Sequence, residues 1–142
     1  MRVRQAGVAD VAAVLAIDST VSDGSGRALY LETAIGQGHC WLALLDDHAA
    51  GFAIFAHSFF AQPFVELLIT RHEYRRRGVG TALLRHIESL CMGGKLFTST
   101  NASNEPMHRF CAVNGFARSG YVENLDEGDP EIIYAKHLSA GP

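Results

Sequence analysis

Features that define several protein classes are scarce or absent in this sequence of 142 residues. It has only three cysteines, Cys40, Cys91 and Cys111, which are widely spaced and form neither a CxxC pair nor a disulfide framework. We interpret them as reduced core thiols, typical of a cytoplasmic protein. No pair among its seven histidines has the spacing of a zinc site with a cysteine partner, so we expect no bound metal.

Basic residues are outnumbered, because 12 Lys and Arg stand against 15 Asp and Glu and give a formal net charge of −3. Such a chain does not attract nucleic acid or an anionic membrane as a whole, so any anion site has to be local. The N-terminal residues lack the apolar centre and cleavage site of a signal peptide, which favours a folded segment over a targeting signal. The stretch His48 to Val65 has no charged residue, but it contains Gly51 and Pro63 and indicates buried strands rather than a membrane helix.

What the sequence does contain is enough apolar material, 48% of its residues, for one core, and we expect a single domain over residues 1–142. Its hydrophobic residues alternate between the period of strands and the period of helices. Strands are expected at Arg2–Gln5, Cys40–Leu45, Gly51–Ser58, Phe64–Thr70, Lys95–Thr100, Phe116–Val122 and Ile132–Leu138. Helices are expected at Val8–Ile17, within Gly24–Gly38, from about Arg76 to Gly93, and at Asn104–Asn114. This order predicts an α/β fold with a mixed sheet and helices packed on it.

One short stretch, YRRRGVG at residues 74–80, concentrates positive charge directly before the predicted helix that starts near Arg76. A helix N-terminus presents unpaired backbone N–H groups and the positive end of the helix dipole, and glycines let a phosphate approach the backbone closely. The spacing matches neither the P-loop nor the dinucleotide fingerprint. The stretch therefore predicts a local site for a pyrophosphate, and the alternative is a solvated basic loop.

The spacing Arg75-x-x-Gly78-x-Gly80 resembles the coenzyme A pyrophosphate loop of the GNAT superfamily of N-acetyltransferases. The surrounding LLITRHEYRRRGVGTALL has the strand, the Tyr-Arg entry and the helix that this family shows, and TSTNASNEPMHRFCAVNGFARSGYV looks like its next strand, Asn-led helix and Gly-Phe. The resemblance implies a GNAT-like fold with a central, mostly antiparallel sheet flanked by helices. It also implies direct transfer of an acetyl group from acetyl-CoA, as cosubstrate, to a primary amine of a small molecule or a protein.

The same resemblance implies roles for residues that hold the cosubstrate. The pantetheine arm would run along the end of the fourth strand, and Asn104 matches the Asn that commonly contacts that arm. Asn104 is equally well explained as a helix cap, and both roles can coexist. The full set of expected CoA-binding residues is Leu68, Ile69, Thr70, Arg75, Arg76, Arg77, Gly78, Val79, Gly80, Thr81 and Asn104.

The reaction needs a general base, because an ammonium group cannot attack before it loses a proton. We expect this base among the polar residues near the fourth strand. Glu66 interrupts an otherwise apolar strand and shares a face with Leu68 and Thr70, and carboxylates near this place act as bases in some family members. The alternative is a surface or ion-paired glutamate. His57 is the second candidate, although a lone histidine in an apolar run is more often a hydrogen-bonded core residue.

The general acid is the point at which the sequence departs from the family. Many members carry a Tyr seven residues after the matched Asn, and here that position is Cys111. A thiol is able to protonate a thiolate, but Cys111 also fits the apolar stripe of its helix. Tyr121, Tyr134 and water are further sources of the proton.

The acceptor is expected to lie near Leu29, Tyr30 and the loop Gly24-Ser25-Gly26, where family members vary. The acidic stretch 126–131 would attract a cationic amine, and the alternative is an acidic loop that only aids solubility. A non-catalytic acyl-CoA binder or sensor of the same fold is the main rival hypothesis. Nucleic-acid binding by the three arginines is a third, with no aromatic stacking platform to support it. Exposed strand edges favour a homodimer, and the oligomeric state stays open.

Overall fold

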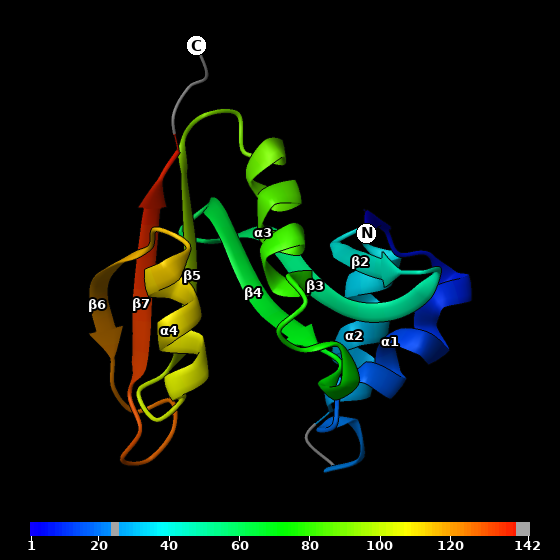
Figure 1. Ribbon diagram of the computed structural model, residues 1–142. Coiled ribbons are helices and arrows are strands. Elements are labelled where there is room, and N and C mark those ends of the chain that lie inside the picture. Colours follow the sequence, from blue (N-terminus) through cyan, green and yellow to red (C-terminus); the bar gives the residue numbers. More distant parts are fainter. Residues whose placement is uncertain (24–25, 139–142) are drawn as a thin grey trace. The chain divides into compact units, whose positions relative to one another are not determined.

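The structure, a computed structural model, describes residues 1–23 and 26–138 and is a mixed α/β fold (Figure 1). Within these residues lie the strands β1 (Arg2–Gln5), β2 (Cys40–Leu45), β3 (His48–Phe59), β4 (Gln62–Thr70), β5 (Lys95–Asn101), β6 (Ala117–Val122) and β7 (Glu131–His137). The same residues form the helices α1 (Val11–Ile17), α2 (Arg27–Gly36), α3 (Val79–Leu90) and α4 (Glu105–Val113), with short 3-10 helices η1 (Val8–Asp10), η2 (Val21–Asp23) and η3 (His72–Tyr74). The strands hydrogen-bond in the order β1-β2-β3-β4-β5-β7-β6, and β4 and β5 run parallel in an otherwise mostly antiparallel sheet. The predicted fold class and element order are confirmed.

Two compact units make up the chain, and β3 and β4 each run through both of them. The first unit contains Met1–Ala56 and Leu67–Ser89, and the second contains His57–Glu66 and Leu90–Pro142. The expectation that residues 1–142 form a single domain stays a prediction. Within the described residues, no helix is both long enough and apolar enough to cross a membrane.

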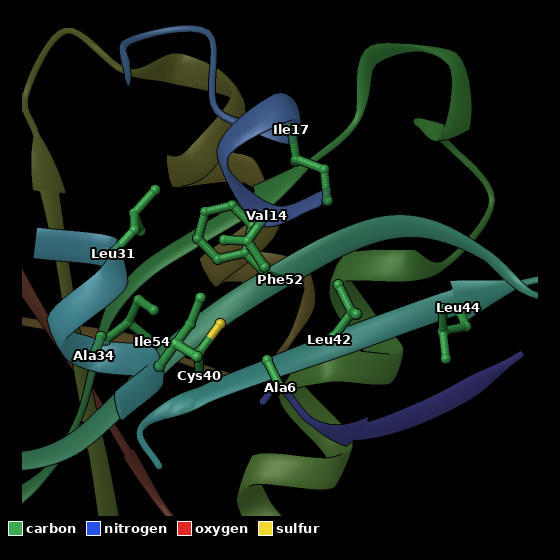
Figure 2. Close-up of a cluster of buried hydrophobic side chains, with 11 residues drawn as sticks. Ala6, Val14, Ile17, Leu31, Ala34, Cys40, Leu42, Leu44, Phe52 and Ile54 are labelled. Atoms are coloured by element: carbon green, nitrogen blue, oxygen red, sulfur yellow. The ribbon is translucent and has the colours of Figure 1, made fainter. Parts of the chain in front are cut away.

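The core of the first unit forms where α1 and α2 cover one face of β2 and β3 (Figure 2). Successive strand residues point to opposite faces, so Leu42 faces these helices while Trp41 faces the other way. Trp41 packs on α3, since its ring lies 4.7 Å from the ring of His86. The side chains of this core are Ala6, Val14, Ile17, Leu31, Ala34, Ile35, Cys40, Leu42, Leu44, Phe52 and Ile54. Helices on both faces hold the β2–β3 pair in place. Burial of each large side chain contributes about 1.5–3 kcal/mol to the stability of the fold.

The second unit is built on β5, which pairs in parallel with β4 through Phe64 and Phe97 and antiparallel with β7. The Thr98 hydroxyl donates to the carbonyl oxygen of Val65 at 2.9 Å and is buried, so it ties β5 to β4 beyond the backbone ladder. Helix α4 lies against β5 and β7 (Figure 1), and β6 forms the edge of the sheet beside β7.

Several element boundaries differ from the prediction for identifiable reasons. The turn between β2 and β3 uses only Asp46 and Asp47, both with positive φ, so β3 already starts at His48. Two adjacent residues with positive φ match the twist of a two-residue hairpin turn. The composition of the segment does not reveal so short a turn, so the strand was predicted to start later. The stretch from His48 to Val65 is not buried throughout, because the β3–β4 turn exposes Phe60, 85% accessible and also at positive φ.

The three cysteines are all free thiols with buried side chains, which confirms that they belong to the core. They come from β2, from the position directly after α3 and from α4. Burial raises the pKa of the Cys40 thiol to about 12, so this thiol stays protonated at neutral pH.

Candidate functional site

The predicted anion loop follows β4 and is folded by short-range hydrogen bonds. At the end of the strand, the backbone N–H of Arg71 donates to the carbonyl oxygen of Ala50 on β3 at 2.8 Å. The N–H of Tyr74 then donates to the Arg71 carbonyl at 2.9 Å, which closes the 3-10 turn η3. Arg75 returns to extended backbone with φ −65 and ψ 151. The chain therefore leaves the strand, turns once and straightens before the helix.

Helix α3 begins at Val79, three residues later than predicted. Arg76 and Gly78 adopt positive φ angles of 65° and 80°, and an α-helix cannot contain such residues. The glycines consequently do not both lie in the first helical turn, because Gly78 precedes the helix and only Gly80 is inside it. The first helical bond runs from the N–H of Ala82 to the Gly78 carbonyl at 2.9 Å.

The geometry leaves a set of backbone donors at the start of α3. The N–H groups of Val79, Gly80 and Thr81 precede the first helical hydrogen bond and have no partner within the helix. Backbone that alternates in the sign of φ, as Arg76 to Gly78 does, turns N–H groups into a concavity suited to an anion. An ideal Cβ on Gly78 would meet nothing within 4 Å, so open space lies beside this backbone.

The three arginines of this loop are exposed and available to a ligand. Among the ion pairs of residues 1–23 and 26–138, none involves Arg75, Arg76 or Arg77. The guanidinium of Arg77 lies 5.7 Å from the centre of the Tyr74 ring, in cation–π range. The nearby carboxylate of Glu73 pairs with Arg71 at 3.0 Å and not with any of these three arginines.

Packing fixes the position of this loop relative to β4 within the first unit. An ideal Cβ on Gly51 of β3 would lie 2.8 Å from the Ile69 carbonyl oxygen, 2.8 Å from Val79 Cγ1 and 3.3 Å from Thr70 Cα. Only a glycine allows β3 to approach this closely, which brings the end of β4 and the start of α3 together. The buried residues Val79, Leu83, Leu84 and Ile87 then hold the helix.

The two candidate bases belong to the second unit, where Glu66 lies in the middle of β4 and His57 lies on β3. Glu66 is half-buried, and its Oε2 accepts a hydrogen bond of 2.7 Å from the hydroxyl of Ser58 on β3. His57 is exposed, so it is not the core histidine that its apolar neighbours indicated. Ser58 carries no motif, and its contact with Glu66 depends on strand pairing that the sequence alone does not reveal.

On α4, the residues predicted from the resemblance differ in exposure. Asn104 is exposed and its Oδ1 accepts from the N–H of Met107 at 3.3 Å, which confirms the helix-cap interpretation and leaves the pantetheine contact a prediction. Cys111 has no exposed surface, and burial raises the pKa of its thiol to about 11. These properties favour packing over proton transfer as the role of Cys111.

The two candidate tyrosines lie in different surroundings. Tyr121, on the edge strand β6, is 58% exposed and has the guanidinium of Arg118 6.0 Å from its ring centre. Tyr134, on β7, is half-buried and its hydroxyl lies 2.6 Å from Nδ1 of His108 on α4. His108 was missed by the sequence reasoning, since its only signal is the three-residue spacing that places it one turn before Cys111.

Part of the predicted acceptor region, Gly24 and Ser25, lies outside the described residues. Leu29 on α2 is 69% exposed, whereas Tyr30 packs against the core of the first unit. An ion pair that the sequence did not reveal stands beside them, because the buried Asp18 contacts Arg27 at 2.7 Å. It ties the segment after α1 to the first turn of α2.

The acidic stretch 126–131 is held by hydrogen bonds in the second unit. Asp126 accepts from Asn101 at 2.8 Å, and Asp129 accepts from the N–H and hydroxyl of Ser103 at 3.0 and 2.6 Å. Glu131 accepts from Ser99 at 2.7 Å. These carboxylates therefore fasten the loop to β5 and its end. In the part of the chain that the structure describes, no group of three or more His, Cys, Asp or Glu could hold a metal ion.

Comparisons with known proteins give a consistent match. Residues 13–116 match the family model described as Acetyltransferase (GNAT) family. A crystal structure of a GNAT-family acetyltransferase from Bacillus cereus ATCC 10987 is 39% identical, covers 96% of each chain and superposes with a TM-score of 0.88. No curated protein matches the chain significantly.

Two more distant structures share the fold alone. The ribosomal-protein-S18-alanine N-acetyltransferase from Escherichia coli is 19% identical, with 99% of this chain and 96% of that chain covered and a TM-score of 0.81. A structure described as a streptothricin acetyltransferase from Bacillus anthracis str. Ames in complex with acetyl coenzyme A is 20% identical, with 70% and 62% covered and a TM-score of 0.65.

Proposed function

Since this chain belongs to the GNAT family of acetyltransferases, we propose that it transfers an acetyl group from acetyl-CoA directly to a primary amine. The observation that carries the proposal is the segment from Ile69 to Thr81. It combines a strand end, the exposed arginines 75–77 and the backbone donors at the start of α3 that have no partner within the helix. This combination suits a ligand with a pyrophosphate and an extended arm.

In this proposal the pyrophosphate lies on the backbone N–H groups from Arg76 to Thr81, since the N–H of Arg75 already donates to the His72 carbonyl at 3.3 Å, and the arginines supply the charge that attracts it. The pantetheine arm runs along Leu68, Ile69 and Thr70, whose backbone it uses in the manner of an added strand. Asn104 would contact the same arm with its side-chain amide. The family uses acetyl-CoA as a cosubstrate, and the reaction requires no metal.

The chemistry proceeds through attack of the neutral amine on the thioester carbonyl carbon. Glu66 is the proposed base and takes the proton of the ammonium group, directly or through water, while the Ser58 hydroxyl fixes one oxygen of its carboxylate at 2.7 Å. Backbone N–H groups near the end of β4 stabilise the negative charge on the carbonyl oxygen. The C–S bond then breaks, and the thiolate of CoA takes up a proton.

The acceptor is proposed as a cationic amine of a small molecule or of a protein. Two proteins of the same fold are described as acting on a ribosomal-protein alanine and on streptothricin, so the fold accommodates both acceptor classes. The formal net charge of −3 favours a cationic partner over an anionic one. The cytoplasmic location and the homodimer stay predictions.

A second function, binding of acyl-CoA without catalysis, is favoured by one observation. The position where the family commonly has a tyrosine holds Cys111, a fully buried thiol with a pKa raised to about 11. Such a thiol gives up its proton poorly. The second function therefore holds if no other group replaces the missing tyrosine as proton donor.

The test has two stages, binding and turnover. Thermal unfolding with acetyl-CoA, CoA, ATP and buffer alone is expected to show a rise in Tm with both CoA species and little with ATP, since a ligand of the native state stabilises it. Arg75→Ala should reduce the CoA-induced rise, while Arg85→Ala, an exposed arginine change within α3, should keep it. Thiol release over a panel of amines then separates an enzyme from a binder. No rise with CoA well above micromolar concentrations would refute both functions.

A further inference from the structure

Three phenylalanine rings gather on one face of the sheet in the second unit. Phe59 of β3 stacks on Phe64 of β4, with ring centres 5.3 Å apart and ring planes inclined by 22°. The Phe59 ring also lies 5.1 Å from that of Phe97 on β5. Phe64 and Phe97 are register partners in the parallel β4–β5 pair. We call these three residues the phenylalanine shelf.

The shelf lies on the face of the sheet that α4 does not cover. Tyr134 of β7 contacts His108 of α4 and is the register partner of Thr98 on β5. Since successive strand residues point to opposite faces, the neighbouring Phe97 points away from α4. All three shelf residues are only half-buried, although phenylalanine is among the residues most often enclosed in a core. An open group of rings of this kind is typical of a binding surface.

The turn between β3 and β4 extends the shelf at the cost of an unfavourable backbone. Phe60 and Ala61 adopt φ angles of 50° and 63°, which a two-residue hairpin turn needs and which Asn and Gly provide most readily. Phe60 is 85% exposed, and its ring meets the ring of Phe59 edge-on at 5.0 Å. A bulky residue in this conformation lowers stability, and such strained residues gather at functional sites.

Charged side chains give the shelf two different ends. Glu66 stands two positions after the shelf residue of β4, so it shares the same face about 7 Å further along the strand. Ser99 stands two positions after the shelf residue of β5, and its hydroxyl donates to Glu131 at 2.7 Å. Lys95 stands two positions before that same residue and is exposed. A ligand on the rings therefore meets carboxylates at one end and an ammonium group at the other.

We propose that the phenylalanine shelf binds the body of the acceptor and selects a cationic primary amine that carries an apolar or aromatic group. This inference rests on the proposed function and names its substrate class. The apolar group lies on the rings. The ammonium group lies at the end with Glu66, the proposed base, because the carboxylates attract it and Lys95 repels it. A strongly polar body is disfavoured, since the rings offer no hydrogen bonds to replace those it makes with water.

The first experiment separates the body of the amine from its charge. Phenethylamine and ethanolamine are both primary amines on a two-carbon chain, and they differ in the group at the other end of that chain. With saturating acetyl-CoA, kcat/KM for phenethylamine should exceed that for ethanolamine by at least about 10-fold, the discrimination that one apolar group commonly gives. Equal values, or a preference for ethanolamine, would overturn the proposal.

Phe64→Leu tests the shelf itself, since it removes a ring and keeps an apolar side chain. It should lower kcat/KM for phenethylamine by about 5-fold, in the range of one aromatic contact, and keep the values for ethanolamine and the KM for acetyl-CoA. Phe110→Leu is the matched control, because Phe110 is also half-buried but belongs to α4. Thermal unfolding verifies folding, and Phe97→Leu replaces a Phe64→Leu variant that does not fold. Wild-type preference in a folded shelf variant contradicts the proposal.

Binding without turnover is measured in the complex with CoA, which carries no acetyl group. Saturation-transfer NMR should show contact of the protein with the ring protons of phenethylamine, and a weaker signal for its neutral analogue phenethyl alcohol. Absence of the phenethylamine signal would overturn the shelf alone, even if amines are acetylated. A phenethylamine signal without acetylation of any amine from acetyl-CoA would instead contradict the proposed function and support the shelf as an amine site.

Discussion

Replacing Gly51 by alanine tests whether the close approach of β3 to β4 shapes the proposed CoA site. The added methyl would stand 2.8 Å from the Ile69 carbonyl oxygen and 2.8 Å from Val79 Cγ1, distances that real Cβ atoms essentially never show. The carbonyl belongs to the backbone of β4 and cannot rotate away, so a strand has to move. We expect a loss of about 1–3 kcal/mol, the usual cost of overpacking a core.

The loss is measurable by thermal unfolding. For a domain of roughly 150 residues it corresponds to a fall in Tm of about 3–10 °C. CoA binding should weaken as well, because the displaced backbone of Ile69 and Thr70 is the proposed support of the pantetheine arm. Titration calorimetry with CoA gives that affinity directly, and circular dichroism verifies that the variant is folded.

Gly36→Ala is the matched control for the same chemical change. Gly36 is exposed at the end of α2, and an ideal Cβ there meets nothing within 4 Å. Alanine at such a helical position is expected to raise stability by about 0.5–1 kcal/mol. If Gly51→Ala unfolds at the wild-type temperature and binds CoA equally well, the argument from close approach is wrong.

Three further predictions address single residues. Asn104→Ala should lower the free energy of unfolding by about 1 kcal/mol through loss of the cap on α4. Asn104→Asp should keep the cap, so weaker CoA binding by a fully stable Asn104→Asp variant would isolate a contact with the ligand. Cys111→Ala should keep kcat within about two-fold if the thiol only packs, since loss of a general acid lowers the rate far more. A large fall in kcat would instead indicate that Cys111 is the acid. The Arg4 side chain and the Gly7 N–H lower the pKa of Asp10 to about 2 from 3.8, so its contribution to stability is present above its ordinary pKa and is lost as the pH falls toward about 2. Asp10→Asn should remove that part of the acid-induced loss in urea unfolding, and an unchanged profile would contradict it.

Sequence patterns predicted best what depends on neighbours along the chain. The strand, the arginines and the helix between Phe64 and Leu90 appear in the structure in the expected order, because hydrophobic period and glycine content act locally. The start of α3 was placed too early, since the sequence shows no sign that Arg76 takes a positive φ. A non-glycine residue in that conformation is rare, and here it shapes the loop that precedes the helix.

Contacts between distant elements account for the rest. Gly51 is constrained only because β3 meets both β4 and α3, and the Ser58–Glu66 bond depends on how two strands pair. His108 and Tyr134 are 26 positions apart, and only the packing of α4 on β7 turns them into a pair. The position of a residue along the chain points to Cys111, whereas the hydrogen bond between His108 and Tyr134 becomes visible only in the folded chain.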